Sequence, residues 1–261
     1  MTKIPNTLFI IAMLIALSPV AYSEKVQRDF YQIKIYHVKN NDQLNQVDQY
    51  LKNIYLPALH RLSIKNIGVF KPIANDTAVV KFVYVLIPFS NVDAWIKLEE
   101  TLTKDPIYLS SSKSFIQAPP DKAPYEKMES ILLTAFSGQR HLALPKTKNA
   151  ERVFELRSYE SPTENLSEKK MAMFNTGGEI EIFKRLGFNP VFYARVISGS
   201  RMPNFMYMPV FDSVRQKEAQ WKIFGNDPQW KEISAIPENE NKVSVSHIDS
   251  ILMHSASYSD F

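Results

Sequence analysis

Two stretches of the chain alternate apolar and polar residues in the way that is typical of β-strands with one apolar face. The first runs from Phe30 to Tyr36, and the second from Arg152 to Tyr159. The apolar faces carry Tyr31, Ile33 and Ile35 in the first stretch and Phe154 and Leu156 in the second. Because the two stretches match in polarity and in their final tyrosine, they indicate a chain made of two related halves.

A helical pattern follows each of these strands. In residues 42–64 the apolar positions recur at helical spacing, and Pro57 predicts a kink. In the second half Ser167 is a plausible N-cap for a helix over residues 168–186, which Gly177 and Gly178 weaken in its middle. Each half therefore begins with a strand and a helix.

The remaining elements of the two halves also match: a hairpin, a second helix and a fourth strand. Turn residues at 74–77 and 198–203 predict hairpins that lead into third strands at 82–87 and 205–210. Second helices follow, and an Asp-Pro pair predicts the end of each one. The fourth strands, residues 128–137 and 248–257, align without a gap. Each half is thus predicted to read strand, helix, strand, strand, helix, strand.

This order predicts an α+β fold of two tandem ferredoxin-like β-α-β-β-α-β units. One such unit covers one face of its sheet with helices and leaves the other face bare. Two sheets can cover each other's bare faces, so we expect the units to close into one α/β barrel. The units are predicted at residues 24–145 and 150–261, joined by the polar residues 146–149.

The first 23 residues predict a signal peptide. Lys3 precedes an unbroken apolar run, residues 8–17, and Ala21 and Ser23 place small residues at a cleavage site. The run is too short to span a bilayer, which needs about 20 residues. We therefore expect an exported protein, periplasmic or extracellular, with no stable membrane span after cleavage. An uncleaved anchor is the alternative, and Pro19 argues against it.

Composition excludes several classes of site. The chain has no cysteine, which rules out disulfides, thiolate metal sites and thiol catalysis. The net charge is only +4, without a long basic cluster, so nucleic acid is not expected as a partner. The five histidines show no metal-ligand spacing. We expect neither a metal nor a cofactor.

Several motifs in the second half resemble the NIPSNAP family. They are FNTGGE at residues 174–179, KRLGFNPVF at 184–192, GSRMPNFMYM at 199–208 and DPQW at 227–230. The first half keeps Asp105-Pro106 but lacks the Gly-Gly-Glu and Arg-Met-Pro motifs, so it looks like a degenerate copy. The resemblance implies a dimeric α/β barrel, a fold shared with cofactor-independent monooxygenases and with many proteins of no known activity. It brings no agreed catalytic residues, so function has to be argued from the site.

The polar faces of the two first strands are the leading candidate for that site. We expect them to point into the barrel and to line a ligand cavity. The alternative is that Glu155 and Arg157 form an internal ion pair that only fills the barrel. The candidate residues are Glu155, Arg157 and Tyr159 in the second half and Gln32, Lys34 and Tyr36 in the first.

Two further groups of polar residues are weaker candidates. His254 is a candidate base inside the barrel, with Tyr159 as a second catalytic candidate and His37 following Tyr36. Arg195, with Tyr193 and Arg201, is a candidate anion site at the barrel's opening. The alternatives are that His254 is a hydrogen-bonded polar residue without a catalytic role, and that the arginines are ordinary solvent-exposed side chains. Glu179 is expected to start a new helix, where its charge favours the helix dipole.

These features favour an exported, non-enzymatic protein that binds a small or apolar ligand or a protein partner. The alternative is an enzyme of the cofactor-independent monooxygenase or isomerase kind, working in the barrel cavity. A homodimer that associates through exposed sheet edges is a third reading. The presence and lining of a cavity distinguish these hypotheses best.

Overall fold

A computed structural model describes residues 27–145 and 149–261. The predicted signal peptide lies outside the described residues. Eight strands form one closed antiparallel barrel in the order β1-β3-β2-β8-β5-β7-β6-β4. The strands are β1 (Phe30–Val38), β2 (Gly68–Pro72), β3 (Lys81–Phe89), β4 (Lys127–Ala135), β5 (Val153–Glu160), β6 (Asn189–Ser198), β7 (Asn204–Phe211) and β8 (His247–Ser255).

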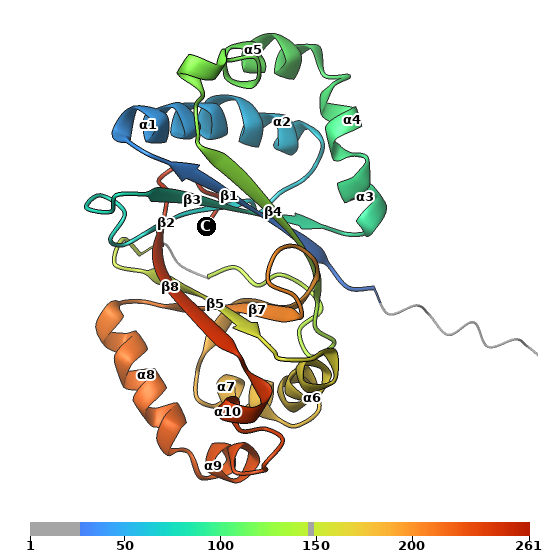
Figure 1. The fold of residues 1–261 in the computed structure, drawn as a ribbon, viewed down its shortest axis with the longest axis vertical. Coiled ribbons are helices and arrows are strands. Elements are labelled where there is room, and N and C mark those ends of the chain that lie inside the picture. Colours follow the sequence, from blue (N-terminus) through green and yellow to red (C-terminus); the bar gives the residue numbers. More distant parts are fainter. Residues whose placement is uncertain (1–26, 146–148) are drawn as a thin grey trace, which may run out of the picture.

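The barrel consists of two four-stranded sheets, one from each half, each in the ferredoxin-like order. Strands β2 and β8 pair along one seam, and β4 and β6 pair along the other. The helices of the first half lie above the barrel in Figure 1, and those of the second half lie below it. The two predicted ferredoxin-like units and their closure into an α/β barrel are therefore confirmed, with both units in one chain.

The helices connect the strands in the predicted positions. Those of the first half are α1 (Asn41–Tyr50), η1 (Leu51–Tyr55), α2 (Leu56–Arg61), α3 (Val92–Ile96), α4 (Leu98–Leu102), α5 (Pro106–Ile116) and η2 (Pro120–Lys122). Those of the second half are α6 (Glu164–Asn175), α7 (Glu179–Arg185), α8 (Val214–Asn226), α9 (Pro228–Ser234) and α10 (Asn241–Ser244).

Local sequence explains where several helices begin. The π-helical turn η1 precedes Pro57, where a kink was expected. The break at Gly177 and Gly178 separates α6 from α7, but the N-cap of α6 is Thr163 rather than Ser167. Each Asp-Pro pair does more than end a helix. Asp105 and Asp227 accept backbone hydrogen bonds and cap the next helices, α5 and α9.

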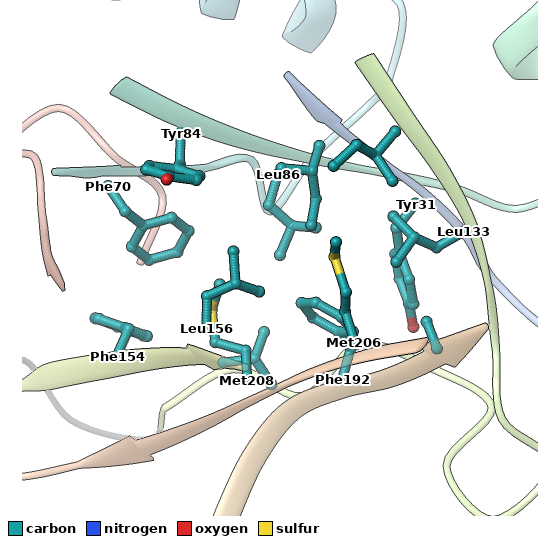
Figure 2. Packing of buried hydrophobic residues seen from close by; sticks show 14 of the residues in the cluster. Tyr31, Phe70, Tyr84, Leu86, Leu133, Phe154, Leu156, Phe192, Met206 and Met208 are labelled. Atoms are coloured by element: carbon teal, nitrogen blue, oxygen red, sulfur yellow. The ribbon is translucent and has the colours of Figure 1, made fainter. Parts of the chain in front are cut away.

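One face of every strand points into the barrel, and this face is largely apolar. Figure 2 shows side chains from the two sheets meeting across the interior, with Tyr84 and Leu86 on one side and Leu156 and Met206 on the other. The opposite faces pack against the helices as two separate cores, one in each half. Most strands are thus buried on both faces, whereas β4 and β8 keep several exposed or half-exposed residues.

The two ends of the barrel differ. At one end the C-terminal Phe261 packs on Phe70 and Phe154, with ring centroids 5.4 and 6.0 Å away, and Leu142 packs on the same core. At the other end β1 and β5 finish and β4 and β8 begin, because neighbouring strands are antiparallel around the whole ring. We call this second end the barrel mouth.

Candidate functional site

A pocket of about 250 Å³ opens at the barrel mouth. Its apolar wall is formed by aliphatic, methionine and aromatic side chains from strands of both halves, and its rim is polar. The apolar residues are Ile35, Phe82, Tyr84, Ile131, Leu156, Met206 and Ile251. The polar residues are His37, Glu129, Ser158, Ser200, Arg201, Asn204 and Asp249. An apolar cavity with a few convergent polar groups is the usual form of a small-molecule site.

Equivalent positions of the two halves build the two sides of this pocket. On the first side Ile35 lies opposite Tyr84 of β3 and opposite Glu129 of β4. On the second side the corresponding residue of β5, Ser158, lies opposite Met206 of β7 and Asp249 of β8. The repeated strand register therefore brings one carboxylate from each half to the same opening.

His37 and Glu129 form a close pair on the first side. The imidazole Nε2 lies 2.6 Å from Glu129 Oε1, and Lys127 Nζ lies 3.3 Å from the same oxygen. The ring of His37 also packs edge-on to Phe82, with centroids 4.7 Å apart. Although partial burial opposes ionisation, hydrogen bonds from Lys127 and His37 hold the pKa of Glu129 below its ordinary value. Glu129 is thus an ionised partner that orients the histidine.

Arg201 holds the carboxylates of the second side. Its guanidinium pairs with Glu160 and, at 2.5 Å, with Asp249. His247 lies 2.9 Å from Asp249, and its side chain is 55% exposed. Burial opposes ionisation here too, but hydrogen bonds from His247 and Arg201 lower the pKa of Asp249. Because Arg201 already neutralises two carboxylates, the predicted role of this arginine as an anion site is not supported.

Tyr84 places a hydroxyl group in the same pocket. Figure 2 shows its ring between the two sheets. Burial, and secondarily the charges of Glu129 and Asp249, raise its pKa, so the phenol stays protonated at neutral pH. Among the described residues, no hydrogen-bond partner of this hydroxyl is found, although other buried tyrosines such as Tyr50 and Tyr108 pair with each other at 2.8 Å. The Tyr84 hydroxyl is therefore a donor available to a bound molecule.

The predicted polar face of β5 does not line the barrel. Glu155, Arg157 and Tyr159 point the other way, into the core between the sheet and the second-half helices. The prediction of a residue-lined interior at this face is wrong, because Phe154 and Leu156 occupy the interior side. The ion pair of the alternative is observed, but it lies between the sheet and the helices and does not fill the barrel.

That ion pair is fully satisfied. Arg157 donates to Glu155 Oε1 at 2.6 Å and to the Tyr159 hydroxyl at 2.9 Å. Glu155 also accepts from Trp221 Nε1 of α8 at 2.7 Å and from Ser250 at 2.6 Å. Because these hydrogen bonds engage the polar groups of Glu155 and Arg157, the cluster links β5 to α8 and offers no free group to a ligand.

The equivalent face of β1 is covered in the same way. Tyr36 is buried in the first-half helical core. Lys34 Nζ reaches the Tyr55 hydroxyl at 3.1 Å and lies 4.8 Å from the centre of that ring. Gln32 donates to Ser130 at 2.8 Å. The expectation that Tyr36 and its neighbours line a barrel cavity is therefore also wrong.

His254 and Arg195 lie outside the barrel as well. The neighbours of His254 along β8 include Met253 in the interior core, so the histidine points outward, where Nδ1 donates to the Arg152 carbonyl at 2.8 Å. Arg195 points away from the interior residues Ala194 and Val196, and it pairs with Glu168 on α6. Neither residue contacts the mouth pocket, which corrects both predictions.

Glu179 begins α7 directly after Gly178, whose φ of 95° suits a glycine. Its side chain is buried, and Oε2 has no hydrogen-bond partner among the described residues. Burial raises the pKa of Glu179 to about 8, against the opposing charges of Lys170 and Arg157. Burial also lowers the pKa of Lys170. Glu179 is therefore mainly neutral at pH 7, a state that sequence did not predict.

Within residues 27–145 and 149–261, no group of three or more His, Cys, Asp or Glu side chains could hold a metal ion. No helix in the same ranges is long and apolar enough to cross a membrane.

Comparisons with known proteins agree with this architecture. A candidate monooxygenase from Lactobacillus acidophilus NCFM is 14% identical, with a TM-score of 0.55 over 88% of this chain and 94% of its own. A candidate monooxygenase from Fusobacterium nucleatum subsp. nucleatum is 8% identical, with a TM-score of 0.57 over 88% and 93%. An anthrone oxidase-like protein is 7% identical, with a TM-score of 0.53 over 88% and 92%. At these identities the likeness shows the fold alone.

Sequence comparison is more specific for the second half. No curated protein matches the chain significantly. The family model described as NIPSNAP matches residues 154–260. This match spans β5 to β8 and includes the motifs that resemble the family. The second half of this chain is therefore a NIPSNAP domain.

Proposed function

We propose that this NIPSNAP-domain protein is an exported binding protein that holds a small, mainly apolar molecule in the mouth pocket. Export is supported by the signal-like pattern of the first 23 residues. Binding is supported by one observation above all, the pocket of about 250 Å³ that combines an apolar wall with a polar rim. Other interior side chains pack as an apolar core, and the pocket measures about 250 Å³, so the occupant is a compact molecule.

Charge favours a neutral or cationic occupant. Glu129 and Asp249 both line the pocket, and each has a lowered pKa, so both are ionised at neutral pH. Arg201 is the matching cation, and its guanidinium already pairs with Glu160 and Asp249. A ligand carboxylate or phosphate would have to compete with these residues for the arginine.

A second candidate function, catalysis in the same pocket, is favoured by the His37–Glu129 pair. A histidine held by a carboxylate is a common arrangement for a general base. The solved structures described as candidate monooxygenases share the fold. His37 takes the place of His254 and Tyr159 in this hypothesis.

A fragment screen with a pocket-filling variant tests the binding function. Ile251 lies at the mouth and is only half-buried, so Ile251→Trp directs added volume into the pocket. Ile223→Trp, on the exposed face of α8, is the matched control. Saturation-transfer NMR with neutral and cationic aromatic fragments should give binding to the parent and the control but not to Ile251→Trp. Equal binding to all three proteins would overturn the proposal.

A further inference from the structure

We infer that the mouth pocket transfers a proton on an enolisable ketone, with His37 as the proton acceptor and Tyr84 as the donor to the ketone oxygen. The inference rests on the proposed function, since it names the chemical class that the pocket takes and what happens to it there. Both groups line the pocket, and both come from the first half of the chain.

His37 has one nitrogen engaged and one free. Nε2 lies 2.6 Å from the ionised Glu129, which fixes the proton on this nitrogen and leaves Nδ1 as the basic atom. No partner for Nδ1 is found in the part of the chain that the structure describes. The side chain is 15% exposed, so the ring is accessible to a molecule in the pocket but shielded from bulk water.

Tyr84 supplies the complementary donor on the same wall. His37 pairs with Phe82, and Ile35 pairs with Tyr84, so the histidine and the tyrosine are diagonal neighbours on adjacent strands. Diagonal neighbours in a sheet are about 7–8 Å apart, and aromatic side chains can reach across that distance. A molecule between them meets an acceptor and a donor a few atoms apart.

This spacing suits a carbonyl group with an acidic C–H beside it. The carbonyl oxygen accepts the Tyr84 hydrogen bond, and the neighbouring C–H faces Nδ1 of His37. The apolar wall, with Met206, Leu156 and Ile251, covers the remaining hydrocarbon of the ketone. Carboxylic acids are disfavoured by the charges of Glu129 and Asp249, which points to neutral ketones.

The reaction involves a proton and no redox step. His37 Nδ1 takes the proton from the α-carbon, and the C–H bonding pair moves into the carbonyl to give an enolate. The Tyr84 hydroxyl stabilises the developing oxygen charge, as a donor placed at that atom does in other enzymes. The imidazolium then returns its proton to the same carbon or to a conjugated one. Glu129 is the positioning residue, because it acts through the histidine.

Deuterium exchange into 2-indanone, followed by proton NMR in D2O, tests the inference on the full chain. Exchange with the parent protein should exceed that with His37→Ala by about 10²-fold or more, the usual contribution of a general base. Tyr84→Phe keeps the ring and should lose about 10²-fold or more of the exchange rate, in line with the loss of one oxyanion donor. His254→Ala, on the outer face, is the control and should exchange like the parent.

Glu129 needs a readout that separates positioning from folding. Glu129→Gln should lower the maximal exchange rate while KM for 2-indanone stays within about twofold, and Glu129→Asp should restore part of the rate. Melting curves identify any variant that fails to fold. If a His37 or Glu129 variant does not fold, the exchange rate of Tyr84→Phe tests the inference in its place.

Two outcomes overturn the inference. If 2-indanone binds the parent but exchanges no faster than with His37→Ala, the proton transfer is wrong, and the proposed binding function stands. If 2-indanone does not bind while other fragments bind and are excluded by Ile251→Trp, the ketone class is wrong. The binding function itself fails only if no fragment distinguishes the parent from Ile251→Trp.

Discussion

Glu129 and Asp249 occupy equivalent positions on β4 and β8, and each has a histidine beside it at the barrel mouth. His37 lies 2.6 Å from Glu129, and His247 lies 2.9 Å from Asp249. The two pairs differ in setting, because His37 lines the pocket whereas His247 is more than half exposed. The two halves therefore place a carboxylate at the same position of the barrel mouth. Glu129 pairs with a histidine inside the pocket, whereas Asp249 is also bound by Arg201.

The first prediction concerns the buried cluster outside the barrel. Arg157→Met leaves Glu155, whose side chain is 1% exposed, without its cation. Breaking a buried pair in this way costs about 3–5 kcal/mol of unfolding free energy. For a chain of this size the melting temperature should fall by roughly 10 °C. Thermal unfolding followed by circular dichroism measures the change.

A second change and a control sharpen this test. Glu155→Gln added to Arg157→Met removes the unpaired charge and should recover part of the loss. Arg195→Met, the control, breaks the pair with Glu168, in which the arginine side chain is 42% exposed. It should cost about 0–1 kcal/mol of unfolding free energy. A single Arg157→Met variant that melts within a degree or two of the parent would contradict the buried cluster.

The second prediction concerns pH and Glu179. Its folded pKa of about 8 lies above the ordinary value of 4.5, so its favourable contribution is fully present below pH 4.5 and is lost as the pH rises toward 8. Glu179→Gln removes this loss. The variant should be more stable than the parent by about 3–4 kcal/mol at pH 7–8 and nearly equal to it at pH 4.5.

Urea unfolding at both pH values measures the effect. Glu181→Gln is the matched control, since it lies on the same helix with its side chain 72% exposed, and it should change little at either pH. A Glu179→Gln variant that is less stable at pH 8 than at pH 4.5, relative to the parent, would show that this carboxyl group is ionised in the folded protein.

The third prediction concerns the closed end of the barrel. Phe261 covers Phe70 and Phe154, and Phe261→Ala removes that ring contact. Since Phe261 is only half-buried, we expect a loss of about 1–3 kcal/mol, below the range for a fully buried phenylalanine. Leu144→Ala, at an exposed position, is the control. If Phe261→Ala unfolds at the parent's urea midpoint, the C-terminus does not seal the barrel.

The sequence predicted the fold well because its signals are local and repeated. Alternation in Phe30–Tyr36, the ungapped match of the fourth strands and the Gly177-Gly178 break all follow from patterns within a few residues. Closure of the two sheets into one barrel then follows from the need to cover apolar faces. The cap at Thr163 was missed because Ser167, four residues later, fits the same local rule.

The site was predicted poorly because its residues depend on which strand face points inward. Both faces of β5 are buried, so the alternation of Phe154 and Glu155 does not tell interior from exterior. The polar face was assigned to the cavity, but Trp221 of α8 satisfies Glu155 on the helix side. His37 and Glu129 come together only through the register of β1 with β4, which single-sequence patterns do not fix.

Methyl NMR of the protein during a fragment titration locates the occupant of the mouth pocket. We expect shifts at the pocket methyl groups of Ile35, Ile131 and Ile251 and none at Ile182, which is buried in the second-half helical core. The shifts should disappear in Ile251→Trp. Binding that shifts the Ile182 signal and leaves the three pocket isoleucines unchanged would contradict a ligand site at the barrel mouth, since the ligand would then lie elsewhere.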